Sequence, residues 1–296
     1  MRANPASTVA YGPWPGAKPD APREGQVRLA LKCAADGSTV LGDLYHAQPL
    51  RVLFPFSERG DLFQAAIACV SGGLVGGDRF EIHVSLAAQT KATIIGQAAE
   101  KIYRSPRAGC VVETSLHAGA GAWFEYLPQE TILFDAAQLR RRTQVFMARG
   151  ARFLGGGIMV FGRAARGEKL MQGLVHDAWE VRDSLGRLVW KDALHMDGDL
   201  EALLANPATF GGAAAYGSLI FASRNAAEHL ESTRDVAGRV CSSALRIGAT
   251  SFRDLLIVRF LGPNTLELRD AFASVWKHLR TAAGGLPPVM PRLWSI

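Results

Sequence analysis

The sequence predicts a mostly β protein of the α+β class, with two helices confined to the C-terminal third of its 296 residues. Apolar and polar residues alternate with a period of two along most of the first two thirds of the chain, which is typical of strands with one buried face. Helical spacing of apolar residues appears only later. Strands and helices do not alternate in βαβ order, which excludes a doubly wound nucleotide-binding sheet.

The first predicted strand begins near Gln26, and a turn at Asp36-Gly37 leads from it to a second strand. The inward-facing positions of the first strand are Val27, Leu29, Leu31 and Cys33. The same alternation predicts further strands near residues 80–86, 91–95, 110–117, 139–147 and 173–182. Residues 181–189 place a polar turn between two apolar stretches and therefore predict a hairpin.

Two helices are predicted near the end of the chain. One begins near Asn264 or Thr265 and stops at Gly284-Gly285, ahead of two prolines. Its apolar face is formed by Leu268, Phe272, Val275, Trp276 and Leu279. The other covers residues 225–239, with Ala226, Leu230, Ala237 and Val240 facing inward.

The N-terminal residues differ in composition from the rest. Residues 1–24 contain five of the fourteen prolines and show no periodicity, so we expect a disordered tail followed by one domain over residues 25–296. This segment lacks the apolar run of a signal peptide, and no stretch reaches the roughly 18 apolar residues of a membrane span. A cytoplasmic protein that does not enter a membrane is expected.

The four cysteines are widely separated and form no C-x-x-C pair, so we expect reduced thiols in the core. They are Cys33, Cys69, Cys110 and Cys241. A net charge of +6 raises the question of nucleic-acid binding. The densest basic run, Arg140-Arg141-Arg142, has no interleaved aromatic residues for stacking, which argues against that function and leaves an acidic protein partner as an equal explanation.

Residues 70–79 read V-S-G-G-L-V-G-G-D-R and resemble a phosphate-binding loop only in their glycines. A P-loop requires Lys and then Ser or Thr after its last glycine, whereas Asp78 and Arg79 stand here. A strand follows where the anion-binding helix would begin. The run is therefore predicted to be a sharp turn, with glycines needed for positive φ or close backbone approach.

Four motifs in this order carry a family resemblance. The run at 70–79 is followed by Q-A-A-E-K-I-Y-R-S at 97–105, Y-L-P-Q-E-T-I-L-F-D at 126–135, and Gly162-Arg163 with Gly167-Glu168. From about Gln26 to about Phe260 the chain resembles the urease accessory proteins of the UreD family, also called UreH. It departs from the family pattern at Glu100, where threonine is common.

The resemblance implies a mostly β fold of layered, helically wound sheets, like a β-solenoid, with two helices. It also implies a non-catalytic maturation factor, a chaperone that assembles with UreF and the GTPase UreG on apo-urease and assists nickel insertion. Nickel would be transient cargo, and no tightly bound cofactor is expected. The alternative from the residues is a hydrolase or carbohydrate-binding β protein with a site near the loop from Gly72 to Asp78.

Three carboxylates are candidates for weak, transient nickel contacts: Asp78, Asp135 and Glu168. Each follows a glycine or an aromatic residue at the end of an apolar run, where a carboxylate must be paired, hydrated or bound to a cation. Turn capping, or a salt bridge to Arg79 or Arg163, is the structural alternative. Tyr103 and Arg104 are candidate partner contacts, because both residue types are favoured at protein interfaces, although Tyr103 could equally pack in the core.

The seven histidines are scattered, with no two within four positions of each other, so the sequence shows no closely spaced ligand set for a tight nickel or zinc site. His83 and His117 lie on predicted strands. For these two we favour hydrogen-bonded surface histidines over metal ligands. The sequence also lacks the G-x-S-x-G motif of a hydrolase nucleophile near Ser71.

Overall fold

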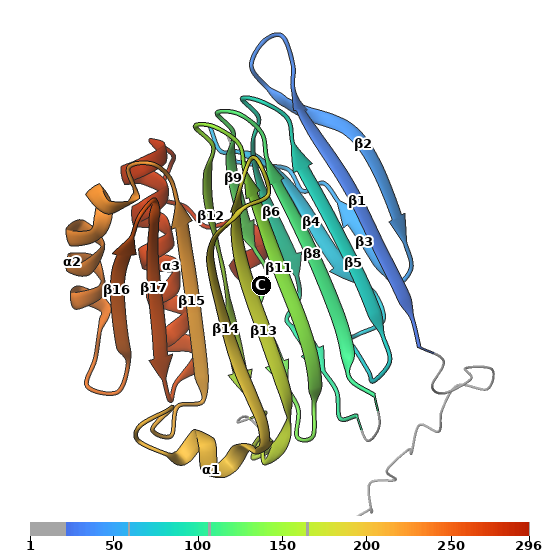
Figure 1. Ribbon diagram of the computed structural model, residues 1–296, viewed down its shortest axis with the longest axis vertical. Helices are drawn as coiled ribbons and strands as arrows, with labels where there is room; N and C mark the ends of the chain where they lie inside the picture. The colour runs from blue at the N-terminus through green and yellow to red at the C-terminus, as the bar shows by residue number, and fades with distance from the viewer. Residues whose placement is uncertain (1–21, 59, 106–107, 164–165, 296) are drawn as a thin grey trace, which may run out of the picture.

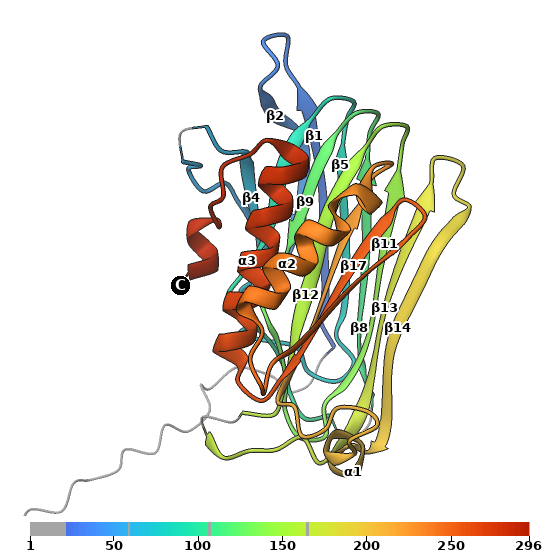
Figure 2. The same cartoon turned by 90° about the vertical axis from the view of Figure 1, so that its left-hand side faces the viewer.

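Two β-sheets lie face to face, and a layer of helices covers the outer face of one of them (Figures 1 and 2). The computed structural model describes residues 22–58, 60–105, 108–163 and 166–295. Most of the proposed tail, residues 1–21, lies outside this part. Within it, the first strand begins at Glu24, two residues before the predicted start at Gln26.

The seven-stranded sheet has the order β14-β13-β11-β8-β5-β1-β2. In that order its strands span Leu188–Asp199, Gln172–Asp183, Gln138–Met147, Cys110–Ala118, Arg79–Leu86, Glu24–Cys33 and Thr39–Ala47. The predicted strands and the β13–β14 hairpin are confirmed. Their buried positions follow the period of two, with Val27, Leu29 and Leu31 in the core.

The ten-stranded sheet has the main order β16-β17-β15-β12-β9-β6-β4-β3. These strands span Arg246–Phe252, Leu255–Gly262, Ala215–Ala222, Arg152–Phe161, Trp123–Leu127, Lys91–Gln97, Phe63–Cys69 and Leu50–Leu53. Two short strands, β7 (Glu100–Ile102) and β10 (Thr131–Leu133), pair with each other, and β10 also pairs with β12.

The chain winds from one sheet to the other and back between β4 and β13. Strands β4, β6, β9 and β12 pair in parallel in one sheet, and β5, β8, β11 and β13 pair in parallel in the other. Each turn of this coil therefore adds one strand to each sheet, as Figure 1 shows. The layered, helically wound β architecture expected from the resemblance is confirmed.

Apolar side chains fill the space between the sheets. Val84, Leu116 and Val145 of the seven-stranded sheet and Ile94, Phe124 and Phe153 of the ten-stranded sheet belong to one buried cluster. In the seven-stranded sheet these residues alternate with outward-facing polar residues, as the period of two predicts. In the ten-stranded sheet both faces are buried, because the helices cover the other face.

Helices α2 (Leu230–Val240) and α3 (Thr265–Gly284) pack on the other face of the ten-stranded sheet (Figure 2). The predicted start and stop of α3 are confirmed, because the Asn264 side chain accepts bonds from two backbone N–H groups and Gly285 ends the helix at φ 62°. Helix α2 follows a 3₁₀ turn at Ala226–His229. The short helix α1 (Leu200–Ala205) was not predicted, since six residues carry no readable periodicity.

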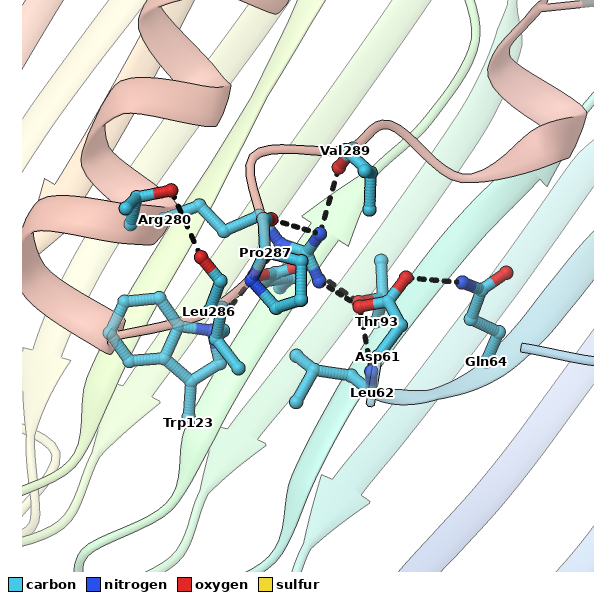
Figure 3. A network of polar contacts seen from close by, with 11 residues as sticks. Asp61, Leu62, Gln64, Thr93, Trp123, Arg280, Leu286, Pro287 and Val289 are labelled. Carbon is cyan, nitrogen blue, oxygen red and sulfur yellow. Dashed lines mark hydrogen bonds and ion pairs between the residues drawn. The ribbon is translucent and has the colours of Figure 1, made fainter. Parts of the chain in front are cut away.

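A buried ionic network joins α3 to the ten-stranded sheet (Figure 3). The Arg280 guanidinium donates to Glu125 on β9 and to Asp61 in the loop before β4. It also donates to the carbonyl oxygens of Pro287 and Val289, at 3.1 and 2.8 Å. These bonds hold the segment after α3 against the sheet, next to a 3₁₀ turn at Arg292–Ser295.

The cysteines are free thiols, but they are not all in the core. Cys110 is buried, and Cys33 and Cys69 are half-buried. The expectation was wrong for Cys241, which is exposed because it caps the C-terminal end of α2 at the surface. None of the helices in the described part of the chain combines the length and apolar character needed to cross a bilayer.

Candidate functional site

The glycine-rich run forms a tight turn between β4 and β5, as predicted. Gly72, Gly73 and Gly77 have φ values of 80°, 144° and 90°. A Cβ atom on Gly73 would lie 2.6 Å from the carbonyl oxygen of Lys101, so the backbones approach too closely for any side chain. Both reasons given for the glycines therefore hold at Gly73.

Asp78 is completely buried at the end of this turn and forms an ion pair with Arg23. Its Oδ2 lies 2.5 Å from Nη2 of Arg23, and its Oδ1 accepts from Nε and the backbone N–H of the same residue. Oδ2 also accepts the Val75 N–H at 3.0 Å, which closes the turn. The ion-pair partner is therefore Arg23 and not Arg79. Arg79 is the first residue of β5, and its side chain is exposed on the outer face, whereas the Asp78 carboxylate is buried.

Asp135 and Glu168 lie together at a different place. The Asp135 N–H donates to Oε1 of Glu168 at 3.0 Å, and Glu168 pairs with Arg163, as the structural alternative expected. The backbone bond from Asp135 and the hydrogen bond and charge of Arg163 lower the pKa of Glu168, against the effect of desolvation. Asp135 accepts the N–H groups of Met171 and Gln172.

A cavity of about 140 Å³ lies between the two sheets. Its volume is enough for a few water molecules, and polar side chains interrupt its apolar wall. The polar side chains are Gln97, Glu100, Lys101, Thr114, Tyr126, Gln129, Thr131, Arg141 and Thr143. Gly72 and Gly73 also line it, so the glycine turn borders the cavity.

Arg141 places a positive charge in the wall of this cavity. Its guanidinium forms two bonds to Asp177, at 2.8 and 3.0 Å, and lies 3.6 Å from Oε2 of Glu100. Burial opposes the charged guanidinium, but the two carboxylates outweigh it and raise the pKa of Arg141. Burial raises the pKa of Glu100, and Arg141 counteracts this only in part.

The basic run at 140–142 is divided between the two faces of β11. Arg141 faces the cavity, whereas Arg142 pairs with Glu180 on the outer face, with Nη2 and Oε2 2.9 Å apart. Arg182 and Lys191 also contact Glu180. The run is therefore not a continuous basic patch on one face of the sheet.

Tyr103 and Arg104 differ in their surroundings. Tyr103 is half-buried; its hydroxyl donates to the Gly72 carbonyl at 3.1 Å, and its ring packs edge-on against Phe134 at 4.8 Å. Much of the Tyr103 side chain is therefore packed against the protein, which was one of the two alternatives considered for this residue. Arg104 is exposed and borders an open surface hollow with Ser105 and Gln138.

Four of the seven histidines lie in two close pairs that the sequence analysis did not find. The ring centroids of His83 and His117 are 4.7 Å apart, and those of His176 and His195 are 5.5 Å apart. Each pair joins neighbouring strands, so a search for ligands close in sequence misses it. In the part of the chain that the structure describes, no group of three or more His, Cys, Asp or Glu side chains is placed to hold a metal ion.

Comparison with known proteins identifies the family. A family model described as "UreD urease accessory protein" matches residues 23–295. The chain belongs to the UreD urease accessory protein family. It is 41% identical over 275 residues to the urease accessory protein UreD of Magnetococcus marinus, covering 92% of this chain and 94% of that protein.

Other members of the UreD family show similar agreement. The chain is 37% identical to urease accessory protein UreD 2 of Methylorubrum populi, with coverage of 92% of this chain and 90% of the relative. The UreD of Methylobacterium sp. is also 37% identical, with coverage of 92% and 94%. The match thus extends over nearly all of the described residues.

The motifs that suggested the UreD family lie on successive turns of the coil and touch one another. Tyr103 of the second motif contacts Gly72 of the first and Phe134 of the third. The Arg163 guanidinium of the fourth motif lies over the Phe134 ring, with Cζ 4.2 Å from its centroid. Residues far apart in the sequence thus form one row of contacts, and Gly72 at its start lines the cavity.

Proposed function

We propose that this chain acts as a non-catalytic factor in urease maturation, assembling with UreF and the GTPase UreG on apo-urease and assisting nickel insertion in the cytoplasm. The observation that carries the proposal is membership of the UreD family over residues 23–295. Relatives at 37–41% identity that carry the name urease accessory protein UreD support it.

Nickel is the cargo in this proposal, and the carboxylates act as separate contacts along its route. Asp135 and Glu168 adjoin each other, whereas Asp78 lies at the glycine turn. The cavity that borders the turn carries the Glu100 carboxylate. Oxygen ligands that are already paired with arginines suit brief occupation, because a closed ligand cage would retain the ion.

Tyr103 and Arg104 supply part of the partner surface in this proposal. Arg104 is exposed and can form a new ion pair, while Tyr103 holds the segment against the glycine turn. Arg104→Glu should therefore weaken co-purification of UreF or urease without unfolding the chain. Arg149→Glu is the matched control, because Arg149 is also exposed but lies beyond the opposite end of β11.

The nickel route is tested by the double variant Asp78→Asn, Glu168→Gln, which removes two carboxylate charges and keeps the side-chain volumes. We expect urease co-expressed with this variant to contain less nickel than urease matured by the unaltered chain, while complex assembly is retained. Glu231→Gln, at an exposed position on α2, is the control. Full nickel loading with an intact complex would refute the route.

The same experiment distinguishes complex assembly from nickel delivery. Co-purification with apo-urease measures assembly of the complex. The metal content of the purified urease measures nickel delivery. Failure of the chain to associate with any urease component would overturn the proposed function itself, whatever the two carboxylates do.

A further inference from the structure

Two histidines stand side by side on the outer face of the seven-stranded sheet. His83 on β5 is in register with Ser115 on β8, and His117 on β8 is in register with Ser85, so the histidines occupy diagonal positions on parallel strands. Diagonal neighbours on one face are within reach of ring side chains. Their ring centroids are 4.7 Å apart.

The surroundings fix one ring and leave the other accessible. The His117 ring stacks on Phe146 of β11, with centroids 4.4 Å apart and an interplanar angle of 6°. His117 is half-buried and His83 is exposed.

We propose that His83 and His117 form a shallow binding site for a divalent first-row transition metal ion such as Ni²⁺ or Zn²⁺. Imidazole nitrogen is a preferred ligand for these ions. Two imidazoles that share a metal at about 2.1 Å each hold their ring centroids roughly 4.5 to 5.5 Å apart. The observed separation of 4.7 Å falls in this range without movement of either strand.

Carboxylates on the same face favour a cation at this position. Glu81 precedes His83 by two residues on β5 and is in register with Glu113 on β8. Like charges directly opposite each other destabilise a sheet, and a bound cation relieves that repulsion. In the structure, the Glu81 carboxylate accepts a hydrogen bond from the Gln26 side chain at 3.2 Å. Glu113 is in register with Arg142 on β11.

The cationic neighbour of the pair is turned away from it. Arg28 on β1 is in register with His83, but its guanidinium lies over the Tyr45 ring on the far side of β1, with Cζ 4.7 Å from the centroid. The second pair, His176 and His195, provides a contrast. Its rings are 5.5 Å apart, at the upper end of the same range, and Arg140 is in register with His176 on the same face.

This proposal does not rest on the role in urease maturation. Two imidazoles completed by water leave most coordination positions exchangeable, so the site binds weakly compared with a four-ligand structural site. It lies on the outer face of the seven-stranded sheet and shares no residue with the proposed nickel contacts Asp78, Asp135 and Glu168. Either can fail without the other.

Titration of the purified full-length chain with NiCl₂ alone, followed by isothermal calorimetry, tests the site. We expect the variant His83→Ala, His117→Ala to bind one nickel ion fewer per chain. Each single variant, His83→Gln or His117→Gln, should weaken that binding step by about tenfold or more, since loss of an outer-shell partner already has this effect. The matched control is His176→Ala, His195→Ala, which removes the same residue types from the same face.

Nuclear magnetic resonance gives a second readout that does not depend on a variant's folding. Paramagnetic Ni²⁺ should broaden the ring protons of His83 and His117 in the unaltered chain at lower metal concentrations than those of His176 and His195. Unchanged stoichiometry in the first double variant, or broadening confined to His176 and His195, would overturn the proposal. Nickel content of urease is not a readout here, so the two proposals remain separable.

Discussion

Arg280 of α3 and Glu125 of β9 form a completely buried ion pair, with Nε and Oε1 2.9 Å apart although the residues are 155 positions apart in the chain. Glu125 also accepts from the Thr93 hydroxyl at 2.6 Å and from the Trp123 indole at 2.8 Å. The pair therefore satisfies its hydrogen bonds where no solvent reaches, and it fixes the helical layer to the sheet.

Replacement of Arg280 should strongly destabilise the fold. Arg280→Met leaves the carboxylates of Glu125 and Asp61 buried without their cation, and breaking such a pair lowers the free energy of unfolding by about 3–5 kcal/mol. Urea denaturation followed by circular dichroism measures the change. The double variant Arg280→Met, Glu125→Gln should recover part of the loss, because the uncompensated charge is removed.

An exposed arginine provides the control for this prediction. Arg234 on α2 pairs with Glu231, and both side chains are at least half exposed. Arg234→Met should change the free energy of unfolding by less than about 1 kcal/mol. A loss for Arg280→Met that is no larger than this would show that the buried pair does not stabilise the fold.

Glu180 should make stability depend on acid pH. Burial alone would raise its pKa, but hydrogen bonds from Arg142, Arg182 and Gln144 outweigh it and lower the pKa from 4.5 to about 2. A lowered pKa stabilises the folded state above the unfolded value of 4.5, and that contribution is lost as the pH falls toward 2.

Glu180→Gln tests this dependence. The variant should be less stable than the unaltered chain at pH 7, and the difference should narrow between pH 4.5 and pH 2. Thermal unfolding across that pH range measures it, with Glu231→Gln as the exposed control. A difference that is constant with pH would contradict the assignment of the contribution to Glu180.

Two glycines should respond in opposite directions to alanine. At Gly73 the added Cβ would lie 2.6 Å from the Lys101 oxygen at φ 144°, so Gly73→Ala should destabilise the chain by about 1–3 kcal/mol. Gly238 lies within α2, and a Cβ atom added there would meet no neighbouring side chain or strand within 4 Å. Gly238→Ala should stabilise the chain by about 0.5–1 kcal/mol, and chemical denaturation compares the two.

Local patterns were sufficient to predict the strands of the seven-stranded sheet, β6 and both longer helices. The other strands of the ten-stranded sheet were not predicted. In β12, for example, both faces are buried, so its residues show no period-two pattern. The alternation around Val27, Leu29 and Leu31 and the caps at Asn264 and Gly285 depend only on neighbouring residues. The winding of the sheets could not be derived in this way. Arg79 and Val111 are register partners 32 positions apart, whereas Cys110 and Leu139 are 29 apart and Gln138 and Leu174 are 36 apart. An irregular period leaves no repeat to detect.

The candidate site was predictable only in part for the same reason. The glycine turn and the pairing of Glu168 with Arg163 are local and were anticipated. Arg23, the partner of Asp78, lies 55 positions away in a segment expected to be a tail. The cavity between the sheets depends on side chains that approach from two layers, and sequence spacing does not report such proximity.

The two carboxylates that flank Arg141 should have different effects on stability. Asp177 holds the guanidinium through two bonds at 2.8 and 3.0 Å, whereas Glu100 lies 3.6 Å away and borders the cavity. Asp177→Asn should therefore lower the free energy of unfolding by about 3–5 kcal/mol, as for a broken buried pair. Glu100→Gln should cause little or no loss at pH 7.

The pH dependence distinguishes Glu100 further. Because burial raises its pKa, the folded state of the unaltered chain loses stability as the pH rises above the unfolded value of 4.5, and Glu100→Gln lacks this loss. The stability of the variant relative to the unaltered chain should therefore increase as the pH rises from 4.5, which urea denaturation at several pH values measures.

If Glu100→Gln is instead as destabilising as Asp177→Asn at pH 7, Glu100 is a structural partner of Arg141. If its stability is retained and nickel loading of co-expressed urease falls, the Glu100 carboxylate serves the cavity and not the fold.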